Sequence, residues 1–165
     1  MVNRILTHEQ IQHKVKRIAY QIYEANVNEK EIVVAGIAGG GLNFAKKIAT
    51  VLKKITEAQI VLCKLQMDKK NPLKSGVNTS IAEEVYKNKS IVIVDDVLNS
   101  GTTLIYGVHH FLKTPIKQLK TAVLVNRNHK KYPIKADYKG ISLSTSLNEH
   151  IRVEFQSKND AVYLE

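Results

Sequence analysis

The sequence predicts an α/β fold in which a parallel sheet is flanked by helices and followed by a small C-terminal hood of short strands. Short, β-branched apolar runs such as 31–37 and 90–97 alternate with segments of helical period, which is typical of strands buried on both faces of a parallel sheet. After residue 125 the pattern changes to short alternating strands and turns, which places the hood at about 126–165. A length of 165 residues fits one domain, 1–165.

The N-terminal third reads as helix, strand, glycine loop and helix. Thr7 and Gln10 have the spacing of a capping box, which predicts that a helix begins there. Its apolar face consists of Ile11, Val15, Ile18, Ala19 and Ile22. The run 31–37 is the first strand, residues 38–41 form a glycine loop, and 44–52 has the period of a second helix.

Three further strands are predicted at 59–65, 90–97 and 119–125. Between the last two lies a helix that contains Leu104, Val108, Phe111 and Leu112. Residues 66–84 lack a clear period, and a loop of this length is usually functional or mobile. Short hood strands are expected at 136–138, 141–143, 151–155 and 161–164. Ligands of such sheets bind beyond the carboxyl ends of the strands, so the loops after Ile37, Leu65, Asp95 and Val125 are expected to converge on one crevice.

Composition limits the partners. The chain has 25 Lys+Arg against 15 Asp+Glu, a net charge of +10, which favours polyanions such as phosphates, nucleotides or RNA. Cys63 is the single cysteine, which excludes an intrachain disulfide and argues against a cysteine zinc site. No apolar run of about 18 residues and no basic-then-apolar leader is present. We therefore expect no membrane span and no signal peptide, and the simplest compartment is the cytoplasm.

The most informative segment couples two acids to a small-residue turn. An apolar strand delivers Asp95 and Asp96 to its carboxyl end, and a helix opens directly after the turn. Backbone N–H groups and hydroxyls at a helix N-terminus form a ready anion site, and glycine allows a phosphate to approach closely. The turn residues are Asn99, Ser100, Gly101, Thr102 and Thr103. The two acids suit sugar hydroxyls or Mg²⁺. The simpler alternative is an acidic strand end followed by a capped helix.

Phosphoribosyl pyrophosphate combines a 5′-phosphate, a ribose diol and a Mg²⁺-bound diphosphate. The segment 91–104 resembles the phosphoribosyl pyrophosphate-binding motif of type I phosphoribosyltransferases. Residues 122–140 resemble one branch of that family, the pyrimidine-operon attenuation regulators that are also uracil phosphoribosyltransferases. The matching residues are Arg127, His129, Pro133, Ile134, Ala136, Asp137, Tyr138 and Gly140. The turn 144–146 also resembles that branch, so the similarity covers nearly the whole chain.

The resemblance implies a role for each segment. The turn 99–103 would hold the 5′-phosphate, and Asp95 and Asp96 would bind the ribose hydroxyls. Mg²⁺, the implied cofactor, would bind through pyrophosphate and ribose, with these two acids as candidate ligands. The pyrophosphate loop would be Ala38, Gly39, Gly40 and Gly41, and the nucleobase would lie near Arg127, Asp137 and Tyr138. The segment 66–84 matches the mobile loop in position, and the implied assembly is a homodimer or larger homo-oligomer.

Three positions depart from the family pattern. The pyrophosphate loop of the uracil branch carries Thr-Arg before Gly, whereas 38–41 offers no cation. The mobile loop retains only Asp68 of a Tyr-Arg-Asp-Asp-like pattern, followed by Lys69 and Lys70. Purine-type relatives place a proton-accepting Asp where this chain has Asn99, which favours a pyrimidine base, uracil, over a purine.

Other interpretations remain open at this point. The chain could be a catalytically weak homologue that senses nucleotides and binds RNA to regulate pyrimidine genes, using basic clusters that have little aromatic interleaving. A dinucleotide fingerprint at 36–41 fails the required glycine spacing, since position 38 is Ala. Without the family resemblance, Asp137 and Tyr138 would be read as a strand with a core tyrosine.

Overall fold

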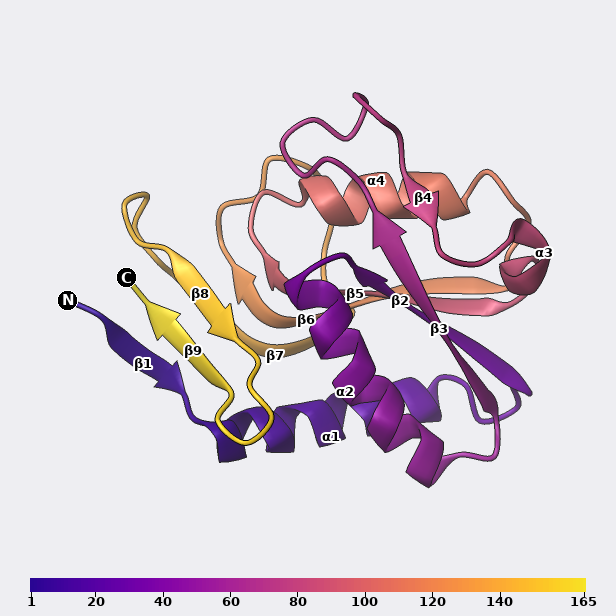
Figure 1. Cartoon of the computed structure of the whole chain (residues 1–165), viewed down its shortest axis with the longest axis horizontal. Coiled ribbons are helices and arrows are strands. Elements are labelled where there is room, and N and C mark those ends of the chain that lie inside the picture. The colour runs from indigo at the N-terminus through magenta and orange to yellow at the C-terminus, as the bar shows by residue number, and fades with distance from the viewer.

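The computed structural model describes residues 1–165, and its centre is a six-stranded sheet (Figure 1). In spatial order the strands are β4 (Asn78–Thr79), β3 (Gln59–Gln66), β2 (Glu31–Ile37), β5 (Ser90–Leu98), β6 (Gln118–Arg127) and β7 (Tyr138–Leu143). All neighbours are parallel except β4, which pairs antiparallel with β3. The predicted α/β class with a parallel sheet is therefore confirmed.

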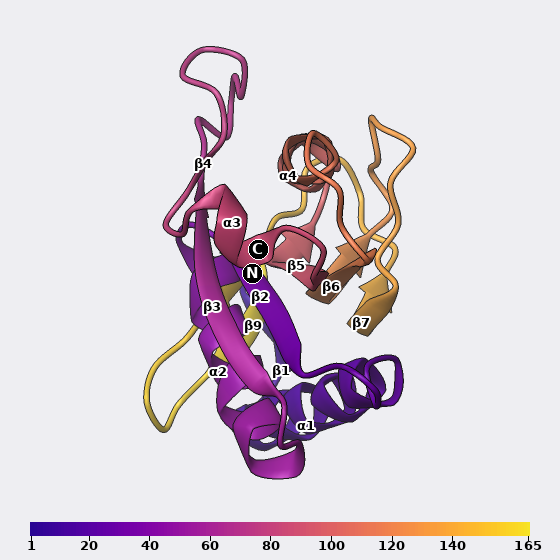
Figure 2. The same ribbon diagram turned by 90° about the vertical axis from the view of Figure 1, so that its right-hand side faces the viewer.

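Helices cover both faces of this sheet (Figure 2). The helices α1 (His8–Glu24) and α2 (Gly40–Ile55) pack on one face, over a core that includes Ile18, Phe44 and Val92. On the other face α3 (Glu83–Tyr86) and α4 (Thr102–Phe111) cover a second core that includes Ile93 and Phe111. Because β2 and β5 contribute side chains to both cores, their sequences are continuously apolar.

The predicted capping box opens α1. Thr7 Oγ1 accepts from Gln10 N at 3.3 Å, and Gln10 Oε1 accepts from Thr7 N at 2.9 Å. The two bonds satisfy backbone donors that the first helical turn leaves free. The apolar face of α1 is buried as predicted, at Ile11, Val15, Ile18, Ala19 and Ile22.

The order of the strands creates the site. From β2 the chain crosses through α2 to β3, whereas from β5 it crosses through α4 to β6, in the opposite direction along the sheet. The loops that leave the adjacent strands β2 and β5 therefore run in opposite directions along the sheet. Parallel sheets leave a crevice at this switch point, beyond the carboxyl ends of the strands.

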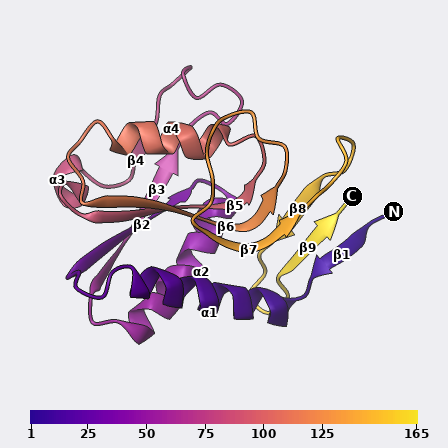
Figure 3. The ribbon, with the colours of Figure 1, turned by 180° about the vertical axis from the view of Figure 1, so that it is seen from behind.

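A second, antiparallel sheet forms the hood, in the order β1 (Asn3–Leu6), β9 (Ala161–Leu164) and β8 (Ile151–Glu154). The set of strands in this hood differs from the expected set in two respects. Residues 138–143, expected as two hood strands, form a single strand of the main sheet, because β7 pairs in parallel register with β6. The strand β1, which was not predicted, joins the hood through β9, so the two chain ends lie side by side (Figure 3).

The segment predicted as a loop at 66–84 contains β4 and the start of α3, and residues 67–77 project beyond the sheet (Figure 2). None of the helices is long and apolar enough to cross a lipid bilayer.

Candidate active site

Two neighbouring carboxylates lie near the carboxyl end of β5, at the switch point of the sheet. Asp95 is 4% exposed, and its Oδ2 accepts from Thr103 Oγ1 at 2.7 Å. Asp96 N donates to Asp95 Oδ1 at 2.9 Å, and Val97 N donates to Asp96 Oδ1 at 2.8 Å. Burial, followed by the charge of Asp96, raises the pKa of Asp95 to about 8, against smaller opposing effects of Thr103 and Lys69. The pair therefore attracts a cation or a hydrogen-bond donor.

The glycine loop lies directly against these acids. A side chain at Gly40 would overlap the Asp96 carboxylate, and a Cβ at Gly41 would lie 2.9 Å from Asp95 Oδ1. Both glycines are thus required by the acids on the neighbouring strand. The contact also places the carboxylates at the N-terminus of α2, whose first turn contains no acidic residue and no side-chain cap. The partial positive charge of this helix end favours anions here.

The predicted phosphate turn connects β5 to α4. No side chain caps α4 and its first turn has no acid. Thr102 N donates to Ser100 Oγ at 3.3 Å, and the other backbone N–H groups at this helix N-terminus are available to an anion. Ser100 Oγ and Thr102 Oγ1 lie 2.8 Å apart. The turn lines a cleft of about 170 Å³ together with Asp95, Asp96 and Lys69. The structure thus brings the acids and the turn 99–103 together in one cleft.

The loop between β6 and β7 packs on the back of the phosphate turn. Ser100 O accepts from Lys131 N at 2.7 Å and from Tyr132 N at 3.2 Å. Gly101 has φ +87°, and a Cβ there would overlap Ile134. Glycine is therefore needed at 101 both for the left-handed backbone and for the close approach of this loop.

Arg127 is buried at the end of β6 and joins the turn to the hood side of the crevice. Its Nη1 donates to Asn99 Oδ1 at 3.3 Å, and its Nη2 donates to the carbonyls of Ser146 at 2.8 Å and Glu149 at 2.6 Å. Its Nε donates to Thr145 Oγ1 at 2.5 Å. With its donors engaged by protein, Arg127 positions the phosphate turn and the 145–149 segment.

Asp137 and Tyr138, predicted to lie at the nucleobase, are elsewhere. They stand at the beginning of β7, whereas the crevice lies beyond the carboxyl end of that strand. Asp137 Oδ2 accepts from Thr121 N at 2.9 Å, and the Tyr138 ring packs against the core under α1. Burial, followed by the charge of Asp137, raises the pKa of the Tyr138 phenol. The alternative reading, a strand with a core tyrosine, describes this placement.

One residue that was not predicted as a site residue lines the cleft. Lys69 lies there beside Asp95 and Asp96. Its place next to Asp68 in the aperiodic segment 66–84 was the available sequence signal. Asn126, near the end of β6, is buried outside the lining of this cleft, where its Nδ2 donates to Ser142 Oγ at 3.2 Å and its Oδ1 has no protein partner.

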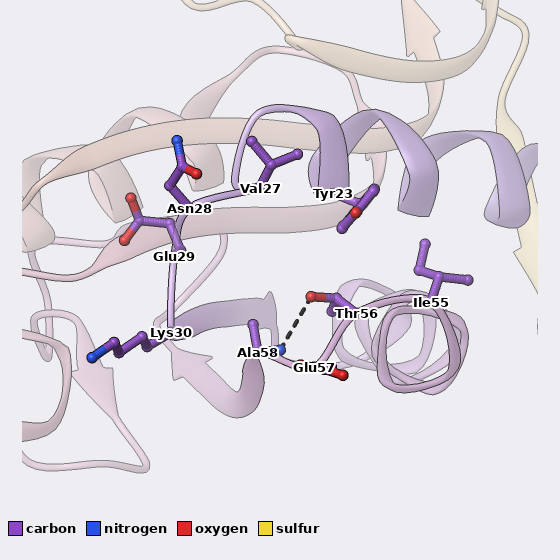
Figure 4. Close-up of a pocket in the computed structure, with 9 residues that line it drawn as sticks. All are labelled: Tyr23, Val27, Asn28, Glu29, Lys30, Ile55, Thr56, Glu57 and Ala58. Atoms are coloured by element: carbon purple, nitrogen blue, oxygen red, sulfur yellow. Dashed lines mark hydrogen bonds between the residues drawn. The ribbon is translucent and has the colours of Figure 1, made fainter.

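A larger cavity of about 570 Å³ lies at the opposite, amino-terminal ends of β2 and β3. Figure 4 shows that its polar side chains, such as Asn28, Glu29 and Glu57, do not converge on a common point. Glu29 is paired with Lys117 at 2.6 Å, and Thr56 Oγ1 accepts from Ala58 N at 3.1 Å. This cavity is larger than the cleft at the switch point, but its polar side chains are not arranged to bind one ligand.

Comparison with known proteins agrees with this geometry. Residues 1–158 match the phosphoribosyl transferase domain family. The chain is 31% identical over 169 positions to the bifunctional protein PyrR of Pediococcus pentosaceus, covering 97% of this chain and 96% of that protein. It is also 31% identical to a PyrR of Streptococcus pneumoniae, with 91% and 88% covered.

Solved structures show the same fold. A hypoxanthine-guanine phosphoribosyltransferase of Bacillus anthracis is 25% identical and superposes with a TM-score of 0.72, covering 86% of this chain and 82% of that one. A hypoxanthine phosphoribosyltransferase of Trypanosoma cruzi, 17% identical, superposes with a TM-score of 0.77 over 97% of this chain and 95% of that one. Matched along nearly its full length in sequence and in fold, the chain belongs to the type I phosphoribosyltransferase family.

Proposed function

We propose that this protein transfers ribose 5-phosphate from phosphoribosyl pyrophosphate to uracil, giving a nucleoside monophosphate and pyrophosphate. The observation that carries the proposal is the cleft in which the acids of β5 lie beside the uncapped N-terminus of α4. Phosphate, ribose and diphosphate each find a matching group there.

The phosphate turn, Asn99 to Thr103, would hold the 5′-phosphate through free N–H groups and hydroxyls. The carboxylates of Asp95 and Asp96 would accept hydrogen bonds from the ribose hydroxyls. The diphosphate would lie at 38–41, where side-chain-free backbone and the N-terminus of α2 face it. In this arrangement the anomeric carbon would lie between the two proposed anion sites.

The reaction breaks the bond between the anomeric carbon and the diphosphate oxygen, and the electron pair leaves with pyrophosphate. The base nitrogen forms the new bond, and its proton passes to the leaving diphosphate or to water. Positioning and charge stabilisation supply the rate, because the sugar becomes oxocarbenium-like before the new bond is complete.

The acids fit a divalent cation that arrives with the substrate. Asp95 and Asp96 are adjacent and form no ion pair with the protein, yet no cluster of three acidic, His or Cys side chains exists to bind a metal alone. Mg²⁺, which typically keeps substrate oxygens and waters as ligands, would be held by these two acids and would neutralise the leaving diphosphate.

One position of the phosphate turn bears on the choice of base. Asn99 stands where purine-type relatives carry a proton-accepting Asp, and its amide cannot accept a proton at neutral pH. This departure from the purine-type pattern favours uracil as the base.

The test is formation of nucleoside monophosphate from phosphoribosyl pyrophosphate with uracil, hypoxanthine, guanine or adenine, each at the same concentration with Mg²⁺. We expect uracil to react fastest. The variant Asp95→Asn/Asp96→Asn should lose activity by a factor on the order of 10²–10³. Faster turnover of hypoxanthine than of uracil would replace the pyrimidine assignment, and equal activity of the double variant would refute the assigned site.

A second function, RNA binding, is favoured by a basic face along α1 and β7. His13, Lys16 and Arg17 are exposed on α1, and Arg17 Nη2 bonds to the carbonyls of Lys139 at 3.1 Å and Gly140 at 2.9 Å. This face lies on the side of the sheet away from α4 (Figure 3), so RNA would not compete directly with the phosphate turn.

Binding of a pyrimidine-operon leader transcript, measured over a range of salt concentrations, tests this second function. Lys16→Gln should weaken the salt dependence by about one unit of slope, as expected when one phosphate contact is lost. An affinity that does not change with salt would contradict binding by this face.

A further inference from the structure

The pyrophosphate end of the cleft contains two carboxylates and no cation of its own loop. Residues 38–41 carry nothing larger than a methyl group. None of the ion pairs in the chain involves Asp95 or Asp96. A diphosphate brought to this place would meet two acids and no cation of the loop 38–41, so any positive side chain that contacts it comes from another element.

Lys69 reaches this place from the loop after β3. Its Nζ lies 3.5 Å from the position that a Cβ of residue 39 would occupy, and Lys69 lines the cleft with the acids and the phosphate turn. The Lys69 ammonium thus lies close to the point from which a side chain of residue 39 would extend. Its charge also lowers the pKa of Asp95, opposing the effect of burial.

The local backbone directs Lys69 toward the cleft. Met67 is buried, and Asp68 Oδ1 accepts from Lys70 N at 2.9 Å and from Asn71 N at 3.0 Å. These bonds close a tight turn around residue 69, as an aspartate does when it caps its own backbone. Lys70, on the same turn, is exposed and does not line the cleft.

Gly39 explains why the cation comes from a different loop. It has φ +94°, a conformation that costs any residue with a side chain. A side chain there would also grow toward Lys69. Gly39 and Lys69 are complementary: the absent side chain of one leaves space for the ammonium of the other.

We propose that Lys69 is the pyrophosphate-binding cation of this protein and replaces an arginine of the pyrophosphate loop. The inference rests on the proposed phosphoribosyl transfer. Lys69 would bind the diphosphate of the substrate and stabilise the charge that passes to it when the bond to the anomeric carbon breaks. Because Lys69 belongs to the loop 67–77, contact of the diphosphate with Lys69 would also hold this loop against the cleft.

The test compares Lys69→Met, Lys69→Arg and the matched control Lys70→Met with the wild-type full-length chain. Calorimetry would measure the affinities for inorganic pyrophosphate and for UMP, which lacks a diphosphate, at one fixed Mg²⁺ concentration. We expect Lys69→Met to bind pyrophosphate about tenfold more weakly or worse, since a charge-assisted hydrogen bond is lost. UMP affinity should fall much less than pyrophosphate affinity, Lys69→Arg should restore pyrophosphate binding, and Lys70→Met should resemble wild type.

Each other outcome has a distinct meaning. If wild type binds UMP and pyrophosphate but Lys69→Met does so equally well, the assignment of Lys69 is wrong while the proposed function stands. If Lys70→Met weakens pyrophosphate binding as much as Lys69→Met, the effect is general loop charge and the assignment is again wrong. If wild type binds neither ligand, the proposed function fails and the assignment of Lys69 fails with it.

Discussion

At the scale of single residues, the site depends on a buried acid that the fold keeps in unfavourable surroundings. Asp95 lies beside Asp96 without a cationic partner, and burial is the main cause of its raised pKa. Structural carboxylates usually have partners. The free-energy cost of burying Asp95 without a cationic partner is consistent with a carboxylate that serves to bind a ligand.

Asp95 makes folding stability depend on pH. Its pKa is raised from 3.8 to about 8 in the folded chain, so between these values the folded state binds more protons than the unfolded state. Stability must then fall as pH rises, by up to about 1.4 kcal/mol per pH unit, and level off above the folded pKa. Urea unfolding at pH 5.5, 7 and 9 measures this decline.

Two variants separate this acid from the rest of the chain. Asp95→Asn should remove its part of the slope, because an amide does not titrate. In Asp96→Asn, the decline in stability should level off at a lower pH, because the charge that helps to raise the pKa of Asp95 is absent. A slope that is identical in wild type and Asp95→Asn would show that other groups cause the pH dependence.

At the scale of elements, the turn before α4 depends on a glycine that a second loop covers. Gly101→Ala would introduce a left-handed alanine and a methyl group that overlaps Ile134. We expect a loss of roughly 3 kcal/mol, the sum of backbone strain and overpacking. UMP affinity should fall too, since the N–H groups of the turn would move.

Gly76 provides the control for that substitution. It also has a positive φ, +71°, but a Cβ there meets nothing within 4 Å. Gly76→Ala should therefore cost only about 1–2 kcal/mol of strain and leave UMP affinity unchanged. Equal losses in the two variants, in chemical denaturation, would mean that the contact with Ile134 contributes nothing.

The elements also show what the sequence could and could not predict. β2 and β5 were predicted to within one residue, because strands buried on both faces read as continuous apolar runs. β1 was missed because Asn3–Leu6 is short and largely exposed, and it exists only by pairing with β9 at the other end of the chain. Local patterns carry no information about such a partner.

The same distinction holds in the site. The turn 99–103 and its acids are contiguous, so their chemistry was visible in the sequence. The place of Tyr138 depends on the register in which it pairs with Ala122 of β6, which the sequence does not state. Lys69 was one of several lysines in an irregular segment, and its place in the cleft, which Lys70 does not share, follows from the folded path of the loop around Asp68.

At the scale of the whole molecule, a single acid ties the hood to both helices below the sheet. The side chain of Asp160, just before β9, is fully buried. Its Oδ2 lies 2.9 Å from Lys47 Nζ of α2 and accepts from Gln12 Nε2 of α1, also at 2.9 Å. Phe155 stacks on Phe44 beside this cluster, with ring centroids 6.0 Å apart. Asp160 Oδ2 also lies 3.4 Å from His8 Nδ1 of α1, and Val162 of the hood belongs to the core under α1 and α2. Asp160 is therefore the polar centre of the contact between the hood and these helices.

Removing that acid should release the hood before the rest of the fold. Asp160→Ala leaves Lys47 and Gln12 without their partner, and we expect a loss of roughly 2–4 kcal/mol, moderated because Lys47 is partly exposed. Hydrogen exchange should quicken most in β1, β8 and β9, because opening of the hood leaves the main sheet paired. The variant Asp160→Ala/Lys47→Met should recover part of the stability, since no unpaired ammonium remains. Uniform acceleration across β2 and β5 would instead mean that the hood and the main sheet unfold as one unit, and that Asp160 stabilises the whole chain.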